Sequence, residues 1–246
     1  MAKVLGESGR YTAEESVKRF GRTTSLLLIG FALMSALGGY SIAKNNLLFS
    51  ILFSLGGGII FYFFYRVAMK HERYRFNYRR GADGEFRVGN ALGLFPDEYN
   101  IINDLKTDFG NIDHVVVGPS GVYVLDSKNW RGIITADENG EILVNGKPIN
   151  KPEVKILTSR VMNIKEKVKT LCGLDPYIKG VLVFPSAHVD AKWGTTKAVH
   201  CIRDEQLYDY IVENKKSNKL NKKEVDSISH AFLALARMDT GFGDKK

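Results

Sequence analysis

The sequence predicts an α/β protein in which a mixed sheet flanked by helices follows two transmembrane helices. Residues 25–43 and 47–65 contain no charged side chain. Between residues 81 and 202, short apolar runs typical of strands alternate with segments of helical periodicity, as in sheets covered by helices. A run rich in basic residues separates these two regions.

The two uncharged stretches are each about 28 Å long as helices, close to the hydrocarbon thickness of a bilayer. A core helix of this length would normally carry polar residues along one face, and neither stretch does. Only Lys44-Asn45-Asn46 separates them, so we expect a tight helical hairpin. The absence of acidic and basic residues favours an anchor over a transport path. A signal peptide cleaved after Ala43 is the weaker alternative.

Basic residues flank the hairpin on its outer sides. Before the first stretch they are Lys18, Arg19 and Arg22. After the second they are Arg66, Lys70, Arg73, Arg75, Arg79 and Arg80. The positive-inside tendency therefore predicts a multi-pass protein of the cell membrane with both termini and the α/β domain in the cytoplasm. The second group could bind anionic lipid headgroups, at about 1 kcal/mol per residue, or hold nucleic acid near a site in the following domain.

Each predicted span contains a pair of small residues four positions apart, Ser35 with Gly39 and Ser54 with Gly58. Such pairs allow two helices to approach closely. Packing between the two helices of the hairpin is the preferred interpretation, and association into a homo-oligomer is the alternative.

We expect five regions along the chain. They are an N-terminal segment (1–24), the hairpin (25–65), a basic juxtamembrane linker (66–80), the α/β domain (81–202) and C-terminal helices with a tail (203–246). The formal net charge of +8 and the sequence pI near 9.3 favour anionic partners, either nucleic acid or phospholipid. The two cysteines, Cys172 and Cys201, have no metal-ligand spacing and favour a reducing compartment.

The periodicity of the soluble part predicts its elements. Besides a central hairpin, strands are expected at residues 99–105, 132–135, 141–144, 178–184 and 198–202, and helices at 154–171, 204–213 and 221–238. In the helix at 154–171, the residues expected to face inward are Leu157, Val161, Ile164, Val168 and Leu171. Those expected in solvent are Lys155, Arg160, Lys165, Lys167 and Lys169. Contact of this basic face with phosphate is the alternative. Asn221 and Glu224 have the spacing of a capping box.

The hairpin carries the most informative residues of the chain. Two apolar runs flank Gly118-Pro119-Ser120-Gly121, which is typical of a turn between antiparallel strands. A two-residue loop there places Asp113 directly opposite Asp126. Side chains alternate along a strand, so Asp126 and Lys128 share one face, and Asp113 joins them across the ladder. Two facing carboxylates are unfavourable unless a cation lies between them.

This constellation has the chemistry needed to hydrolyse a phosphodiester. Mg²⁺ (or Mn²⁺) held by Asp113, Asp126 and a backbone carbonyl near Ser127 would neutralise phosphoryl charge and supply a nucleophile from water. The ammonium group of Lys128 would orient that water or stabilise the transition state. The alternative is that Asp113 marks a strand start while Asp126 and Lys128 are surface residues at a strand end.

The order of motifs resembles a known family. Gly84-Glu85, then Asp113, then Asp126-Ser127-Lys128-Asn129-Trp130 is similar to the nuclease-related domain, NERD, of the PD-(D/E)xK nuclease superfamily. The resemblance covers residues 81–186. It implies a restriction-endonuclease-like fold, with Asp113 and Asp126 as metal ligands and Lys128 as the motif lysine. Glu85, the acidic residue of the first helix, would assist the metal or its water shell. The chain has Asp126 where family members more often carry Glu.

Glu85 can also be judged from its own surroundings. In a helix over residues 83–94, Glu85, Val88 and Leu92 lie on one face, so the carboxylate would point towards the sheet. Favourable placement in the first turn of that helix is the alternative role. His114 alternates to the strand face opposite Asp113, which favours a core role.

Taken together, these residues favour a membrane-anchored, Mg²⁺-dependent nuclease that acts on DNA or RNA at the cytoplasmic face. The alternative is a catalytically inactive module that keeps the nuclease fold and binds nucleic acid or a protein partner at the membrane. A stress or transport accessory protein, in which the spans do the work, is a third and weaker hypothesis.

Overall fold

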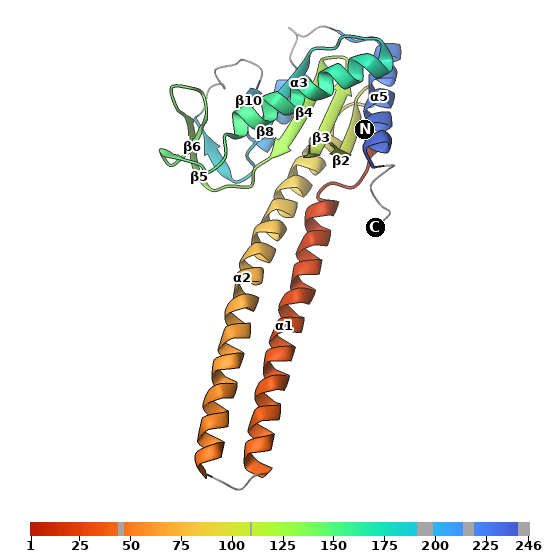
Figure 1. Ribbon diagram of the computed structural model, residues 1–246. Coiled ribbons are helices and arrows are strands. Elements are labelled where there is room, and N and C mark those ends of the chain that lie inside the picture. Colours follow the sequence, from red (N-terminus) through yellow and green to blue (C-terminus); the bar gives the residue numbers. More distant parts are fainter. Residues whose placement is uncertain (44–46, 109, 191–198, 214–218, 241–246) are drawn as a thin grey trace. The chain divides into compact units, whose positions relative to one another are not determined.

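The computed structural model describes residues 1–43, 47–108, 110–190, 199–213 and 219–240 (Figure 1). The chain divides into two compact units. Tyr11–Arg80 forms a helical unit, and Met1–Arg10 joins Gly81–Lys246 in an α/β unit. The division differs from the expected one, because the first ten residues belong with the α/β domain. The predicted turn at residues 44–46 lies outside the described residues.

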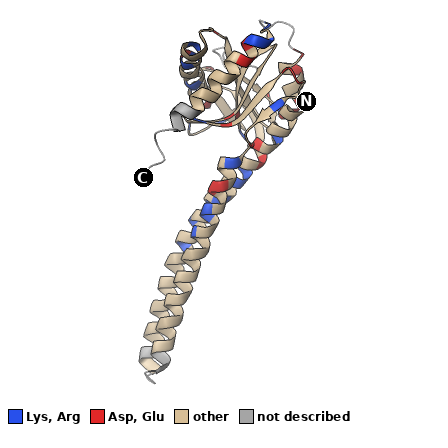
Figure 2. Ribbon diagram, turned by 90° about the vertical axis from the view of Figure 1, so that its right-hand side faces the viewer, with Lys and Arg blue, Asp and Glu red and all other residues tan. Residues whose placement is uncertain are grey.

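The helical unit is built from α1 (Arg10–Ala43) and α2 (Leu47–Gly93). Both helices are long and apolar enough to cross a membrane by length and composition. Only 11% of each apolar stretch is buried, unlike the core helix of a soluble protein. Charged residues gather at one end of this unit, and the rest of it carries almost none (Figure 2). The predicted linker at 66–80 is helical, since α2 continues through it without a break.

The small residues that bring α1 and α2 together are not the predicted ones. A Cβ built at Gly30 would lie 2.8 Å from the Phe64 side chain, and one at Gly57 would lie 3.4 Å from Met34. Gly39 and Gly58 have nothing within 4 Å of that position. Ser35 and Ser54 are also exposed. The prediction that these two pairs pack within the hairpin is therefore wrong.

Beyond the apolar stretches, arginine side chains pack on aromatic rings of the neighbouring helix. The Arg19 guanidinium lies 4.8 Å from the ring centre of Tyr78 and 5.3 Å from that of Tyr74. Arg75 lies 5.2 Å from the Phe20 ring and also pairs with Glu72. Such cation–π contacts contribute about 0.5–1 kcal/mol each at exposed sites. Part of the basic segment is thus used to hold the two helices together.

The α/β unit is organised around a mixed sheet, as the sequence predicts. The sheet has six strands in the order β1-β2-β3-β4-β8-β10. The strands are β1 (Lys3–Leu5), β2 (Asn100–Thr107), β3 (Gly110–Gly118), β4 (Gly121–Ser127), β8 (Ile178–Val183) and β10 (Val199–Ile202). The pairs β2–β3 and β3–β4 are antiparallel. The pairs β1–β2, β4–β8 and β8–β10 are parallel.

Helices cover both faces of this sheet. On one face lie α3 (Glu153–Cys172) and α5 (Lys222–Thr240), where Val124 packs in a cluster with Leu157 and Phe232. On the other face lie α4 (Leu207–Ile211) and the C-terminal end of α2. Both pack in a cluster with Tyr123 and Leu125. Because neighbouring residues of β4 point to opposite faces, this strand contributes side chains to the hydrophobic clusters on both faces of the sheet. Figure 1 shows α3 crossing the sheet.

Most predicted elements are present with small shifts at their ends. A second sheet, in the order β7-β6-β5-β9, contains β5 (Gly132–Ala136), β6 (Ile142–Val144), β7 (Lys147–Pro148) and β9 (Ala187–Val189). The helix expected at 204–213 is split into a 3₁₀ turn, η1 (Asp204–Gln206), and α4. The capping box of α5 is confirmed, since Glu224 N donates to Asn221 Oδ1 and Asn221 N to Glu224 Oε2.

The first residues of the chain add an edge strand to the main sheet. β1 pairs in parallel with β2, with Val4 opposite Ile101. Ala2 N donates to the Phe95 carbonyl at 2.7 Å. Ser8 Oγ donates to the carbonyl of Glu85 at 2.6 Å. The N-terminal segment is therefore part of the α/β unit, held by main-chain hydrogen bonds and by the Ser8 side chain.

His114 is fully buried in this unit and contacts Asn103 Oδ1 through Nδ1 at 2.8 Å. Burial lowers the pKa of His114 to about 3. The ordinary pKa is 6.5, so below that pH the unfolded chain binds a proton that the folded chain excludes. At pH 5 this difference should cost about 2 kcal/mol of stability.

We therefore expect the thermal midpoint Tm to fall between pH 7 and pH 5, and the fall to be smaller in His114→Gln. The matched control is His188→Gln, because His188 is exposed. Tm measured across this range in detergent is the check, and equal slopes for wild type and His114→Gln would contradict the prediction.

Candidate active site

The β3–β4 hairpin has the predicted register. His114 faces Leu125, Val115 faces Val124, and Gly118 faces Gly121. One step beyond the paired residues, Asp113 reaches across the ladder, and its Oδ2 accepts a 2.6 Å hydrogen bond from Ser127 N. The hairpin thus brings Asp113 to the strand end that carries Asp126.

The Asp113 carboxyl group lies in a site that disfavours its charge. Its burial, and then the neighbouring charges of Asp126 and Glu85, raise the pKa of Asp113 well above its ordinary value. The hydrogen bond from Ser127 N and the charge of Lys128 oppose this shift without cancelling it. Like charges this close are normally relieved by a shared proton or by a cation.

Lys128 is the cationic centre of the site. Its Nζ lies 2.8 Å from Asp126 Oδ2 and 3.2 Å from Glu153 Oε2. Burial opposes the charge, but Asp126, Glu153 and Asp113 outweigh it and raise the pKa of Lys128 above its ordinary range. The side chain is therefore an ammonium group at neutral pH, suited to stabilise negative charge and unsuited to act as a base.

Two residues of α3 that the sequence analysis did not assign to the site also reach it. Glu153, the first residue of the helix, pairs with Lys128. Arg160 Nη1 lies 3.5 Å from Asp126 Oδ1, and the side chain is only 17% exposed. The prediction that Arg160 lies on a solvated outer face is wrong. Glu153 and Arg160 are seven positions apart, two helical turns on one face, which is the signal that could have found them.

The other basic residues of α3 are largely engaged with acids at the surface. Lys165 and Lys169 both pair with Asp175, and Lys167 pairs with Asp108. This supports the expectation of a solvated face for them.

Glu85 reaches the site from α2. It is 6% exposed, and Val88 and Leu92 on the same helical face are fully buried, so the inward orientation is confirmed. The alternative role in a first helical turn is wrong, because α2 begins at Leu47. Gly84 permits the approach: a Cβ there would lie 2.6 Å from Asn129 Cβ. A side chain at residue 84 would push apart the two segments that carry Glu85 and Lys128.

The fit of a divalent ion follows from the donor chemistry. In the described parts of the chain, no three His, Cys, Asp or Glu side chains are close enough together to hold a metal ion. Two facing carboxylates remain, and Mg²⁺ is often bound by one or two carboxylates, with waters and substrate phosphates completing its shell. Ser127, the last residue of β4, lies between Asp126 and Lys128, so its side chain alternates to the other face and its backbone borders the carboxylates, with its N–H donating to Asp113. Asp113 and Asp126, with the backbone at Ser127, therefore fit a hard cation.

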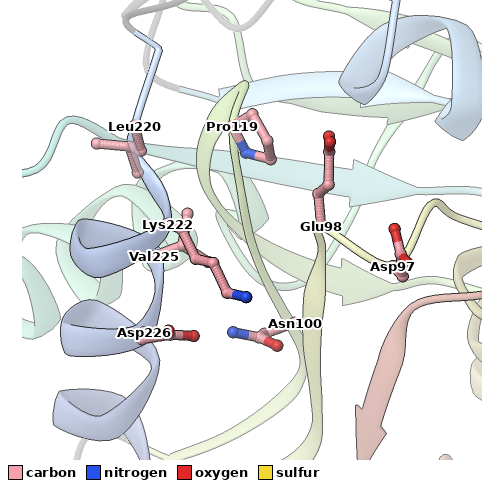
Figure 3. Close-up of a pocket in the computed structure, with 8 residues that line it drawn as sticks. All are labelled: Asp97, Glu98, Asn100, Pro119, Leu220, Lys222, Val225 and Asp226. Atoms are coloured by element: carbon pink, nitrogen blue, oxygen red, sulfur yellow. The ribbon is translucent and has the colours of Figure 1, made fainter.

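The fold also has a pocket that shares no residue with this carboxylate cluster. It has a volume of ≈ 550 Å³ and lies between the start of α5, the start of β2 and the β3–β4 turn (Figure 3). Its lining residues are Asp97, Glu98, Asn100, Pro119, Leu220, Lys222, Val225 and Asp226. Three acids against one lysine make this pocket unsuited to a phosphate backbone.

One comparison with known proteins, with family models, agrees with the motif order. The family model of the nuclease-related domain matches residues 80–185. No curated protein matches the chain. Among solved structures, Pyrococcus furiosus SfsA in complex with Ca²⁺ is similar at 13% identity with a TM-score of 0.22, over 61% of this chain and 51% of that one. The chain thus spans about half the length of that protein. Residues 80–185 of this chain are therefore similar to the nuclease-related domain, NERD.

Proposed function

We propose that this protein is a membrane-anchored nuclease that hydrolyses phosphodiester bonds of DNA or RNA with Mg²⁺ or Mn²⁺. The observation that carries the proposal is the convergence of Asp113, Asp126 and Lys128 at one end of the β3–β4 hairpin. Asp113 and Asp126 would hold the ion, with the carbonyl near Ser127 as a further ligand. When bound, the ion would neutralise phosphoryl oxygens and lower the pKa of a coordinated water.

The other residues have roles that follow from their charge. Lys128 remains protonated, so it stabilises the charge that develops on the phosphoryl group and orients the attacking water. Glu153 also pairs with Lys128, at 3.2 Å, and helps to position it. Glu85 is buried close enough to raise the pKa of Asp113, so it orders the water shell on that side.

A catalytically inactive module is the second candidate, favoured by one observation. Asp126 already has two cationic partners, Lys128 at 2.8 Å and Arg160 at 3.5 Å. If those partners exclude the ion, the domain would bind nucleic acid or a protein partner without cleaving.

Cleavage assays on the full chain in detergent or nanodiscs separate the two. Labelled single- and double-stranded DNA and RNA are incubated with Mg²⁺, with Mn²⁺ and with EDTA. The nuclease proposal expects metal-dependent products from wild type and none from Asp126→Asn. Equal yields from the two proteins, or no products with either metal, would favour the inactive module.

We also propose that both termini and the nuclease-related domain lie in the cytoplasm. Two candidate spans connect β1 to the rest of its own sheet, and two crossings return the chain to the side where it started. The flanking basic residues favour the cytoplasmic side, where anionic headgroups would bind them.

Thiol labelling of intact cells tests this topology. Asn45→Cys should react with a membrane-impermeant reagent, and Glu7→Cys only after permeabilisation, in a background with both native cysteines replaced by alanine. Labelling of Glu7→Cys in intact cells would reverse the assignment.

A further inference from the structure

The guanidinium group of Arg160 is largely buried near Asp126, and its contacts there are poor. Its contact with Asp126 Oδ1 is 3.5 Å, longer than an ordinary hydrogen bond. Its Nε is buried and has no hydrogen-bond partner in the described part of the chain. A buried donor left unpaired costs about 1–3 kcal/mol, so this arrangement is unfavourable unless another acceptor completes it.

Asp126 is poorly placed to be that acceptor. Its Oδ2 is held by Lys128 at 2.8 Å, which leaves Oδ1 for a single long contact from Arg160. The planar guanidinium fork matches two oxygens of one anionic group, as in a carboxylate or a phosphate. Here the guanidinium meets one carboxylate oxygen at 3.5 Å, and its buried Nε has no acceptor among the described residues.

The backbone opposite Arg160 leaves space for the guanidinium group. Gly110, at the start of β3, has φ +105, a conformation that favours glycine. A Cβ at this position would lie 3.3 Å from Arg160 Nη2. A glycine on β3 and a long cationic side chain on α3 thus place the guanidinium beside Asp126.

We propose that Arg160 binds a phosphate of the nucleic-acid backbone at this site. Its guanidinium donates to the non-bridging oxygens of a phosphodiester next to the carboxylates. The long contact with Asp126 is the arrangement without substrate. The inference rests on the proposed nuclease function and assigns the substrate contact within it.

The competing explanation is that Arg160 only neutralises Asp126. Asp126→Asn separates the two, because it removes the charge to be neutralised and also leaves the substrate uncleaved. The experiment measures fluorescence anisotropy of a labelled oligonucleotide with the full chain in detergent, in EDTA. The proteins compared are Asp126→Asn, Asp126→Asn with Arg160→Gln, and Asp126→Asn with Lys155→Gln. Lys155 is the matched control, an exposed cation on the same helix.

A phosphate contact predicts that Arg160→Gln weakens binding at least fivefold in the Asp126→Asn background. It also predicts a less steep fall of log K with log salt, by about one in the magnitude of the slope. Lys155→Gln should change binding less than twofold. Arg160→Lys keeps the charge but loses the fork, and should fall between Arg160→Gln and the parent. Tm of each variant checks that the fold is intact.

Equal binding by the parent and its Arg160→Gln derivative would overturn the inference, and so would the absence of any oligonucleotide binding by the parent. Because binding is read without cleavage, a phosphate contact can be found even if wild type cleaves nothing. The opposite outcome is also distinguishable. If wild type cleaves, and Arg160→Gln changes neither binding nor KM, Arg160 does not contact the phosphate and the nuclease proposal is unaffected.

Discussion

Lys128→Met should lower kcat for nucleic-acid cleavage by about 10³-fold, the effect expected when one preorganised donor to developing charge is removed. The raised pKa of Lys128 means that a full positive charge is lost. Methionine is unbranched and similar in length, so it fills the same space. Single-turnover cleavage at saturating metal measures the effect on the chemical step.

The same substitution should also destabilise the protein. Lys128 is 20% exposed and contacts Asp126 and Glu153, so its removal leaves two largely buried carboxylates without their common partner. Breaking a buried ion pair from one side typically costs about 3–5 kcal/mol. Loss of activity could therefore reflect loss of fold, and a second variant is needed to separate the two.

Lys128→Met combined with Glu153→Gln provides that separation. Neutralising Glu153 removes one of the unpaired charges, so we expect the double variant to recover part of the lost Tm. Cleavage should stay at the level of the single variant, because the ammonium group is still missing. Recovery of cleavage to within tenfold of wild type would mean that Lys128 stabilises the fold and has no direct role in the chemical step.

The hairpin that carries these residues could be predicted because local rules determine it. A Gly-Pro-Ser-Gly turn between two apolar runs fixes the register, and the period of two along a strand then decides which side chains share a face. The same holds for most of α3, whose inward residues Leu157, Val161, Ile164 and Val168 are buried as expected. The prediction is wrong for Leu171, which lies in the last turn of the helix and is 39% exposed. Both predictions depend on residues that are close in sequence.

The parts that were missed depend on contacts between distant segments. β1 spans three residues, too few for a periodic pattern, and it exists because β2, far along the chain, offers an unpaired edge. Arg160 shares a helical face with Glu153, but only the packing of α3 on the sheet brings that face to Asp126. Gly39 and Gly58 belong to real small-residue pairs, yet a Cβ at either position would meet nothing of the partner helix within 4 Å. The spacing of such a pair does not say which face of its helix meets a neighbour.

Asp113→Asn should stabilise the metal-free protein at alkaline pH. Burial and the charges of Asp126 and Glu85 raise the folded-state pKa of Asp113 above its ordinary 3.8. A group shifted in this direction contributes stability below its unfolded-state pKa and loses it as the pH rises through the folded-state value. At pH 8 the ionised carboxylate therefore opposes folding. Asparagine keeps an acceptor for Ser127 N and removes the charge.

We expect this variant to gain about 1 kcal/mol at pH 8, or about 3 °C in Tm, and to gain less at pH 5. Asp209→Asn is the matched control, since Asp209 is exposed and should respond little. A variant less stable than wild type at pH 8 in EDTA would contradict the electrostatic account of the site.

Added metal should make wild type more stable than Asp113→Asn at pH 8, the reverse of the order expected in EDTA. A ligand that binds only the folded state stabilises it by RT ln(1 + [L]/Kd), about 2.7 kcal/mol at one hundred times Kd. Wild-type Tm at pH 8 should therefore rise with Mg²⁺ or Mn²⁺, while Asp113→Asn should respond weakly because it has lost one of the two facing carboxylates. If both proteins respond equally, the ion binds elsewhere, and the repulsion at Asp113 is relieved by a proton shared with Asp126. A response in wild type alone would place the cation between these two acids, which is what the proposed hydrolysis requires of them.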